Sequence, residues 1–562
     1  MSATDAIHHL ADDMLAHLRQ TSAQARRRSG MPIESLDDLS FDAARREAAY
    51  CREGLAALEH IPLGELGHEE WLLARLLRHS FVSGIDAEAD YWLTFAVTPY
   101  SGGWVLAGVH DILASQPVAT DADRERFLAL ARDYGTLLQQ VADKTEQQAA
   151  CGIRVPAPAI PGVRATLAGL RSAARNLVTD ATPARAPAEA DSPAFAAELR
   201  ALADSVIEPA YDRLQGILDD RYAALAPTAV GLGQFPDGAA SYRRRIARAM
   251  GRPLDPMAIH ERGLADVDAI ELRMGEVRDV LGFRGSRDEF HAELRVDPRF
   301  LAKAPEDVER RYLACMARIG PVIPTYFSQL PKSPYAVRRV DPAAEAGMTF
   351  GYYQVPTPAD PVGYYRYNGS NLASRPLVNA AHLIYHELVP GHHFHLALEF
   401  ENERVHPLRK FLYYGAFAEG WAEYAAGLAG EMGLYDDPYD LYGHLASELF
   451  VATRLVVDTG LNALGWSLER ARQFMREHVL EPDALIATET LRYSTDLYGQ
   501  ALDYRLGYHY FGDLRRRAEA SLGARFDLRR FHDTVIGSGG MPLEVLAEHV
   551  DRYVRSESGA AA

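Results

Sequence analysis

The sequence predicts a mainly α-helical fold with a small β-hairpin or sheet beside a histidine-rich helix. Apolar residues recur every three or four positions in 55–77, 127–141 and 195–225, which is the period of amphipathic helices. Short tyrosine-rich runs with strand character come just before the histidine-rich stretch. The chain has 562 residues, 48% of them hydrophobic, so it is long and apolar enough to bury a large core.

The chain divides into two regions. Residues 1–230 show one amphipathic pattern after another and are predicted to form an N-terminal α-helical region. The boundary is predicted in 231–238, because Pro236, Asp237 and Gly238 favour a tight turn. Residues 231–562, also mostly helical, then carry the candidate metal site. We expect the two regions to flank one cleft.

Two strands are predicted ahead of the histidines, over 348–355 and 362–367, joined by a proline-rich loop. An edge strand beside a metal can bind an extended substrate by strand addition. The candidate substrate-binding residues of this region are therefore Tyr352, Tyr353, Tyr365 and Asn368. A purely structural hairpin with packed tyrosines is the alternative interpretation.

The stretch 382–395 holds five histidines and one glutamate, and it begins a zinc-peptidase pattern at His386 and Glu387. His392 is six positions after His386, about 240° around an ideal helix, so a straight helix cannot use both. Pro and Gly between them predict a break that returns His392 to the metal side. His382 with His386, four apart, is the rival pair. His393 is seven positions from His386, about 10 Å along a helix, which is too far for one ion.

A third ligand is predicted downstream at Glu419, because two-His-one-Glu zinc sites take their glutamate from a following helix. Glu423 lies one helical turn later on the same face. It could replace Glu419 as the ligand, or it could orient a metal-bound imidazole. The aromatic residues around the two glutamates favour burial, where an unpaired carboxylate is costly.

A second group of candidates lies near the carboxyl end: Tyr498, Gln500, Tyr504 and Arg505. A tyrosine hydroxyl or an arginine close to the metal could stabilise the oxyanion formed when water attacks a carbonyl. An arginine could also hold a substrate carboxylate through two hydrogen bonds. For Tyr504 core packing is the alternative role.

The segments HELVPGHH at 386–393, AEGWAEY at 418–424, RLVVDTGLNALGW at 454–466 and RYSTDLYGQALDYRLG at 492–507 resemble the bacterial "domain of unknown function 885" proteins. Those proteins are similar to helical zinc peptidases of the gluzincin type, so the resemblance implies a large helical metallopeptidase-like fold. It also implies His386, His392 and Glu419 as zinc ligands and Glu387 as the base.

The chain departs from this family at three positions. Asn462 stands where the family usually has a histidine, Tyr498 where it has a proline, and Glu423 where it tends to have an apolar residue. An asparagine side chain still makes hydrogen bonds but cannot carry charge. Asn462 is therefore kept as a candidate catalytic residue whose role has changed, and the reaction is expected to have a specialised substrate.

Composition sets limits on partners and compartment. The net charge of −18 disfavours nucleic acids and anionic membrane surfaces. The first ten residues lack the pattern of a secretory signal, and no apolar run approaches a membrane span. The three cysteines, Cys51, Cys151 and Cys315, have no paired spacing, which favours reduced, buried thiols in the cytoplasm.

Together these patterns predict a cytoplasmic, Zn²⁺-dependent hydrolase of a peptide or peptide-like amide bond. Its partner would be a peptide or an amino-acid-derived small molecule. The alternatives are a metalloenzyme that performs a specialised non-peptidase reaction on an amino-acid-derived metabolite, and a non-catalytic metal-binding protein of the same fold. Glu387 favours an enzyme, because a binding protein has no need of a base beside the metal.

Overall fold

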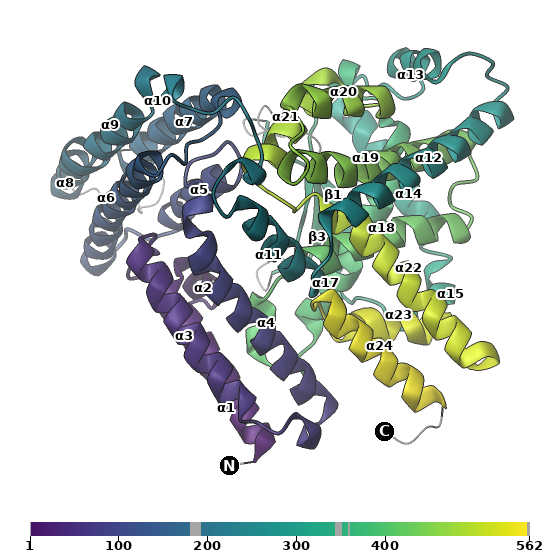
Figure 1. The fold of residues 1–562 in the computed structure, drawn as a ribbon, viewed down its shortest axis with the longest axis horizontal. Helices are drawn as coiled ribbons and strands as arrows, with labels where there is room; N and C mark the ends of the chain where they lie inside the picture. Colours follow the sequence, from purple (N-terminus) through teal and green to yellow (C-terminus); the bar gives the residue numbers. More distant parts are fainter. Residues whose placement is uncertain (1, 180–192, 343–344, 346–350, 358–359, 559–562) are drawn as a thin grey trace. The chain divides into compact units, whose positions relative to one another are not determined.

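The computed structural model describes residues 2–179, 193–342, 345, 351–357 and 360–558. Helices dominate these residues and the strands form one small sheet, so the predicted mainly α fold is confirmed (Figure 1). The chain forms two compact units. Unit 1 contains Met1–Arg244, Leu461–Leu468 and Glu489–Tyr498, and unit 2 contains Arg245–Gly460, Glu469–Thr488 and Gly499–Ala562.

Among the described residues of unit 1, all regular secondary structure is helical. Its helices are α1 (Ala3–Thr21), α2 (Ala23–Arg28), α3 (Phe41–Glu59), α4 (His68–Asp90), α5 (Ser101–Ala114), α6 (Asp121–Ala150), α7 (Ile160–Thr179), α8 (Pro193–Leu202), α9 (Glu208–Ile217) and α10 (Asp220–Ala224). The predicted helix over 127–141 lies within α6. The pattern over 55–77 is broken between α3 and α4, where Pro62, Gly64 and Gly67 interrupt it.

The boundary between the units differs from the predicted one. It follows Arg244, inside α11 (Gly238–Met250), rather than residue 230, and two late segments return to unit 1. Long-range hydrogen bonds hold them there: the Gly231 N–H donates to the Ser494 carbonyl at 2.8 Å, and the Tyr100 N–H donates to Asp496 at 2.9 Å. The spacing of apolar residues in the sequence does not show that these two late segments belong to unit 1.

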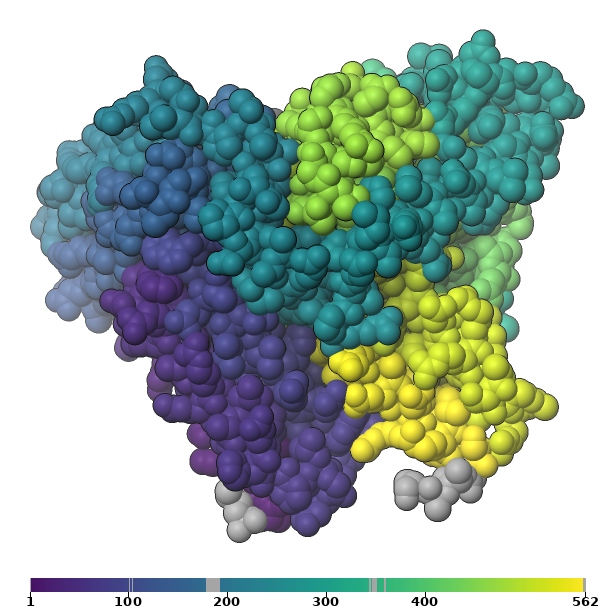
Figure 2. Space-filling view, viewed as in Figure 1, coloured from purple at the N-terminus to yellow at the C-terminus, as the bar shows by residue number. Residues whose placement is uncertain are grey.

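Unit 2 holds the remaining elements. Its helices are α12 (Pro256–Val280), α13 (Arg287–Val296), α14 (Pro305–Ile319), α15 (Ile323–Tyr326), α16 (Ala380–Glu387), α17 (His392–Glu401), α18 (Gly415–Glu431), most of α19 (Pro438–Asn462), most of α20 (Leu468–His478), the first part of α21 (Asp483–Thr495), α22 (Leu502–Leu522), α23 (Leu528–Gly537) and α24 (Leu543–Ser558). Part of its surface is formed by α22 and α24, which are yellow in Figure 2.

The core of unit 2 joins α12, α13 and α19. Val267, Ile270, Met274 and Val277 follow one another at three and four positions on α12, so they form a single apolar stripe. The stripe packs with Phe290 of α13 and with a buried cluster on α19 consisting of Tyr442, Leu445, Ala446, Leu449 and Ala452.

The sheet has three strands in the order β1-β3-β2, with β1 at Tyr335–Arg339, β2 at Gly351–Gln354 and β3 at Gly363–Tyr367. β2 and β3 form the predicted antiparallel pair, with Tyr353 opposite Tyr365, and β1, which the sequence did not predict, runs parallel to β3. The start of the predicted first strand, 348–350, lies outside the described residues. β2 is an edge strand, and its Tyr352 is exposed.

Two glycines set the closest helix contact in unit 2. Gly420 of α18 and Gly507 of α22 face each other, and a Cβ added to either would overlap the other helix. This close approach explains a glycine in each of the two motifs AEGWAEY and ALDYRLG. It places Glu419 and Tyr504, which are neighbours of these glycines in sequence, on adjoining helices.

Among the described residues, no helix is both long and apolar enough to cross a membrane. The cysteines are free thiols: Cys51 and Cys315 are buried as predicted, whereas Cys151 is exposed because it follows the last residue of α6 in a surface turn.

Candidate metal centre

The predicted break lies between α16 and α17. α16 ends at Glu387 and α17 begins at His392, with a cis Val389–Pro390 peptide bond in the turn. Gly391 is required there, because a Cβ would overlap the His386 carbonyl oxygen. The Trp421 indole N–H donates to the Pro390 carbonyl at 2.9 Å and fixes the turn against α18. The break brings the two histidines together, with ring centres 4.8 Å apart.

Three donor atoms from three helices converge at this point. Oε2 of Glu419 lies 3.3 Å from Nε2 of His392 and 3.6 Å from Nε2 of His386. Two ligands about 2.0–2.1 Å from a tetrahedral zinc ion are themselves about 3.3 Å apart, so the observed separations fit such an ion. All three residues are largely buried. The predicted set His386, His392 and Glu419 therefore forms a candidate metal centre.

The carboxylates and imidazoles of this centre act strongly on one another. Burial acts to raise the pKa of Glu419, but the imidazoles of His392 and His386 outweigh it and hold the pKa well below its usual range. Burial acts to lower the pKa of His386, and the carboxylates of Glu419 and Glu423 raise it to about 10. The site thus attracts positive charge, which is what a cation-binding centre requires.

The rival histidines have other partners. Both ring nitrogens of His393 are engaged, Nδ1 with the Tyr353 hydroxyl at 2.8 Å and Nε2 with the Ser333 carbonyl at 3.1 Å. His382 lies in a second group of three with His386 and Glu423, and its Nδ1 is 3.0 Å from Nδ1 of His444. That second group uses Nδ1 of His386, whereas the first uses Nε2.

Glu423 takes the position of an orienting carboxylate. Its Oε1 lies 3.1 Å from Nδ1 of His386 and 3.9 Å from Nε2 of His382. A carboxylate on the far nitrogen of a metal-bound histidine fixes the tautomer and makes the ligand more basic. The residue is buried and its pKa is lowered, since His382 and His386 outweigh the effect of burial.

Glu387 follows the ligand His386 directly and is enclosed at the end of α16. Burial raises the pKa of its carboxyl group, while His392, His386 and a hydrogen bond from the Tyr353 backbone act in the opposite direction. A carboxyl group with a raised pKa is suited to take and return a proton near neutral pH. The edge strand β2 therefore borders the candidate base, as the sequence predicted for the sheet.

Two tyrosines face the centre. The ring of Tyr504 stacks parallel to that of His386 with centres 6.4 Å apart. The Arg454 guanidinium lies 4.6 Å from the centre of the Tyr504 ring. Tyr413, which the sequence did not single out, is 65% exposed. Desolvation, followed by the charges of Glu419, Tyr504 and nearby carboxylates, raises its pKa well above the usual value. Its only sequence signal is its place just before α18.

Arg505 does not take the predicted catalytic position. Its guanidinium donates to Glu448 and to Asp266, both at 3.0 Å, and the side chain is buried. Glu448 also binds Arg273 at 3.0 Å and lies 3.8 Å from His444, so a network of buried charges extends from His382 to Asp266. Because two carboxylates engage the guanidinium, its contacts give no support to a role on the reacting carbonyl or on a substrate carboxylate.

The predicted substrate-binding residues differ in their surroundings. Tyr353 binds His393, and Asn368 is committed to the backbone, donating to the Glu345 carbonyl and accepting from the Ser370 N–H. The buried hydroxyl of Tyr365 interacts with that of Tyr312. Oε1 of Gln500 is buried and has no hydrogen-bond partner among the described residues, so it is available to a ligand.

Two further candidates belong to unit 1. Oδ1 of Asn462 accepts from the Leu232 N–H and its Nδ2 donates to the Tyr493 carbonyl, both at 3.0 Å, and the residue is fully buried. Both ends of the amide are therefore used within the fold of unit 1. Tyr498 is buried in the same unit.

Fold and site together define a mainly α-helical protein with a two-histidine, one-glutamate candidate metal centre. The chain belongs to the bacterial protein family of unknown function DUF885, whose model matches residues 24–550. This confirms the resemblance seen in the motifs. No curated protein matches the chain.

Two solved structures share the fold. A "putative lipoprotein" from Colwellia psychrerythraea is 24% identical with a TM-score of 0.87, and the match covers 99% of this chain and 100% of that one. A "putative lipoprotein of unknown function" from Shewanella oneidensis is 17% identical with a TM-score of 0.77, covering 96% and 99%. At these identities the likeness concerns the fold alone.

Proposed function

We propose that this protein is a zinc-dependent hydrolase that cleaves a peptide or peptide-like amide bond, similar in its centre to the helical gluzincin peptidases. The observation that carries the proposal is the convergence of His386, His392 and Glu419 at separations suited to one tetrahedral ion, with Glu387 directly beside them. A donor set of two imidazoles and one carboxylate leaves a coordination position open, as catalytic zinc sites do.

In this proposal His386, His392 and Glu419 hold the ion. When bound, zinc supplies Lewis acidity toward water and toward a substrate carbonyl. Glu387 accepts a proton from the attacking water and returns it to the nitrogen of the leaving amine. Glu423 keeps the imidazole of His386 in the orientation that presents Nε2 to the ion.

The hydroxyl groups of Tyr413 and Tyr504 are the candidates for stabilising the oxyanion. The ring of Tyr504 stacks against that of His386, and the charge of Glu419 acts on the hydroxyl of Tyr413. A donor of this kind contributes most where charge develops during the reaction. They replace Arg505 in that role.

The proposal is tested by measuring metal content and turnover together. Zinc-reconstituted wild-type protein should hold about one equivalent of zinc, and His386→Ala should lose it. Glu387→Gln should keep the zinc while turnover of a peptide library and a panel of N-acyl amino acids falls by about 10²–10⁴-fold, since general-base catalysis has that size. Glu403→Gln, an exposed glutamate after α17, is the matched control.

Two results would contradict the proposal. Zinc well below one equivalent in the reconstituted wild type would remove the metal centre. Full turnover in Glu387→Gln would reject Glu387 as the base and would favour a different reaction at the same ion.

We also propose that the protein works in a reducing compartment such as the cytoplasm. Cys151 is an exposed free thiol, and exposed thiols persist where thiols are kept reduced. Cell fractionation with a thiol-labelling step should find the protein in the cytoplasmic fraction with Cys151 reduced, whereas recovery of oxidised protein from a membrane or extracellular fraction would refute this.

A further inference from the structure

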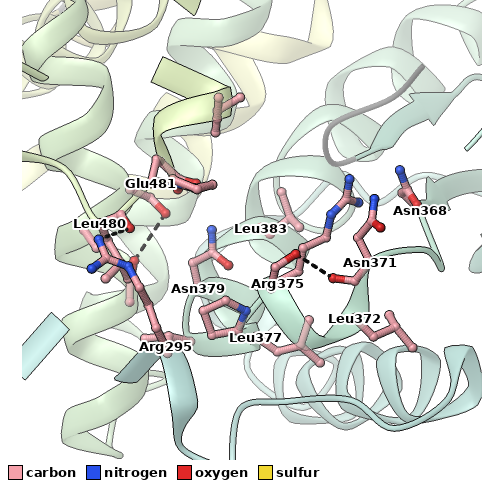
Figure 3. A pocket seen from close by; sticks show the side chains of 18 of the residues that line it. Arg295, Asn368, Asn371, Leu372, Arg375, Leu377, Asn379, Leu383, Leu480 and Glu481 are labelled. Atoms are coloured by element: carbon pink, nitrogen blue, oxygen red, sulfur yellow. Dashed lines mark hydrogen bonds between the residues drawn. The ribbon is translucent and has the colours of Figure 1, made fainter. Parts of the chain in front are cut away.

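A cavity of about 420 Å³ lies around the amino-terminal end of α16 in unit 2 (Figure 3). Its walls come from the segment 368–379 that precedes α16, from Leu383 on α16 itself, and from parts of α19 and α21. This volume is within the range of small-molecule sites. None of the three candidate zinc ligands lines it, so it is separate from the metal centre.

The lining of the cavity favours a ligand with one negative charge and an apolar body. Its charged residues are Arg295, Arg375 and Glu481, which sum to one positive charge. Figure 3 shows the ends of Arg375 and Asn371 gathered at one side of the pocket, with Arg295 and Glu481 at the other. The planar guanidinium suits a carboxylate, which it can hold through two hydrogen bonds. The apolar lining includes Leu372, Leu377, Leu383 and Leu485.

The charged side chain of Arg375 is half-buried. Burial lowers its pKa, and Tyr312, Tyr365, Glu345 and Glu481 act in the opposite direction. Of the two carboxylates, Glu345 is already bound through both oxygens by Arg339, at 2.7 and 2.9 Å.

The cavity also has a defined position relative to the candidate base. Leu383 is three residues before His386 and four before Glu387, so on a helix it lies between them, about 60° from the first and about 40° from the second. Leu383 lies one helical turn before Glu387, about 6 Å along the helix axis. Two residues of an extended substrate span about this length. Tyr312 lines the cavity, and its ring packs against that of Tyr365 on β3 with centres 5.6 Å apart.

We propose that this cavity receives the carboxylate-bearing end of the substrate, and that Arg375 is the residue that recognises the carboxylate. The substrate is then a short peptide with a free carboxyl terminus, or an N-acyl amino acid, whose apolar side chain lies against Leu372, Leu377 and Leu383. This inference rests on the proposed function for the bond that is broken, but the binding step can be measured by itself.

The test compares N-acetyl-glycyl-leucine with its carboxyl-terminal amide, which differ only in the charge of the end group. Calorimetry on zinc-loaded Glu387→Gln measures binding without turnover. The free carboxylate should bind about 10–100-fold more tightly, the equivalent of a hydrogen bond to a charged group. Arg375→Met should abolish the difference, and Arg375→Lys should retain part of it. Arg284→Met, whose side chain is 81% exposed in the same unit, should keep all of it.

The outcomes separate the two proposals. Equal binding of the two peptides, binding of neither, or a preference that survives Arg375→Met would overturn the inference. If wild-type protein cleaves the amide as well as the free acid, the hydrolase stands and the pocket assignment falls. If the preference is present and depends on Arg375 while wild type cleaves neither peptide, the pocket stands and the hydrolase is in question. Thermal unfolding of Arg375→Met and Arg375→Lys checks that both are folded.

Discussion

Unit 2 contains two clusters in which carboxylates lie beside imidazoles. Only the second cluster also contains arginines. In the metal centre, Glu419 faces two imidazoles at 3.3 and 3.6 Å, and three donors meet at one point. In the charge network, Glu448 and Asp266 are each held at 3.0 Å by Arg505, and Glu448 is also held by Arg273. The second cluster supplies its own cations, whereas the first is arranged to accept one. A buried group of carboxylates and imidazoles therefore does not by itself define a metal site.

In the charge network, cationic side chains of the protein stabilise the carboxylates. Burial acts to raise the pKa of Glu448, but His444, Arg505 and Arg273 lower it to about 2. In the same way His509 and Arg505 lower the pKa of Asp266 to about 2, against the effect of burial. These carboxylates are stabilised within the protein itself. Loss of a partner should therefore affect folding in the network and metal binding in the centre.

Removing a ligand should have the largest effect on function. His392→Ala takes away one of three donors, so zinc stoichiometry should fall close to zero and turnover to background. The metal-free protein should also lose some stability, because buried Glu419 keeps only one of its two imidazole partners. Metal analysis and urea unfolding measure the two quantities. His9→Ala, at an exposed histidine of α1, should leave both unchanged. Retention of a full equivalent of zinc would show that the ion uses the His382 group instead.

Removing Arg505 should have the largest effect on stability. Arg505→Met leaves Glu448 and Asp266 buried without that cation, and breaking a buried ion pair costs about 3–5 kcal/mol. Urea unfolding should report this loss, while the protein that remains folded still binds one zinc. Arg310→Met, at a 73% exposed arginine, is the control. A catalytic defect without loss of stability would restore Arg505 to the reaction.

Glu423 lies where the two clusters meet, so its substitution should be intermediate. Glu423→Gln keeps the shape but weakens the support of His386, and such partners change metal affinity by about 10–100-fold. Competition with a chelator measures the affinity, and saturating zinc should restore one equivalent. Unchanged affinity would show that Glu423 belongs to the charge network alone.

The sequence predicted that His386 and His392 come together because the signal was local. Proline between His386 and His392 interrupts an apolar helix because it lacks a backbone N–H and clashes with the preceding turn. The turn that this proline and the following glycine form brings the two imidazole rings together. The sequence could not predict the partners of Arg505, because Asp266 and Glu448 are far away in the chain. The same limit applies to Tyr413, which has no motif, and to strand β1, which pairs across 28 residues of sequence (335 to 363).

The smallest effect is expected at Asn462, where the chain departs from its family. The sequence suggested a changed catalytic role, but both ends of the side-chain amide bind backbone groups of unit 1, the Leu232 N–H and the Tyr493 carbonyl. Asn462→Ala leaves these buried groups unpaired, so we expect a loss of about 1–3 kcal/mol in stability. Asn462→His should be destabilising too, because an imidazole cannot reproduce both bonds in the same geometry. Zinc content and turnover of the folded protein should stay at the wild-type level. A change in turnover at unchanged stability would instead place Asn462 in the catalytic machinery, as its family position suggested.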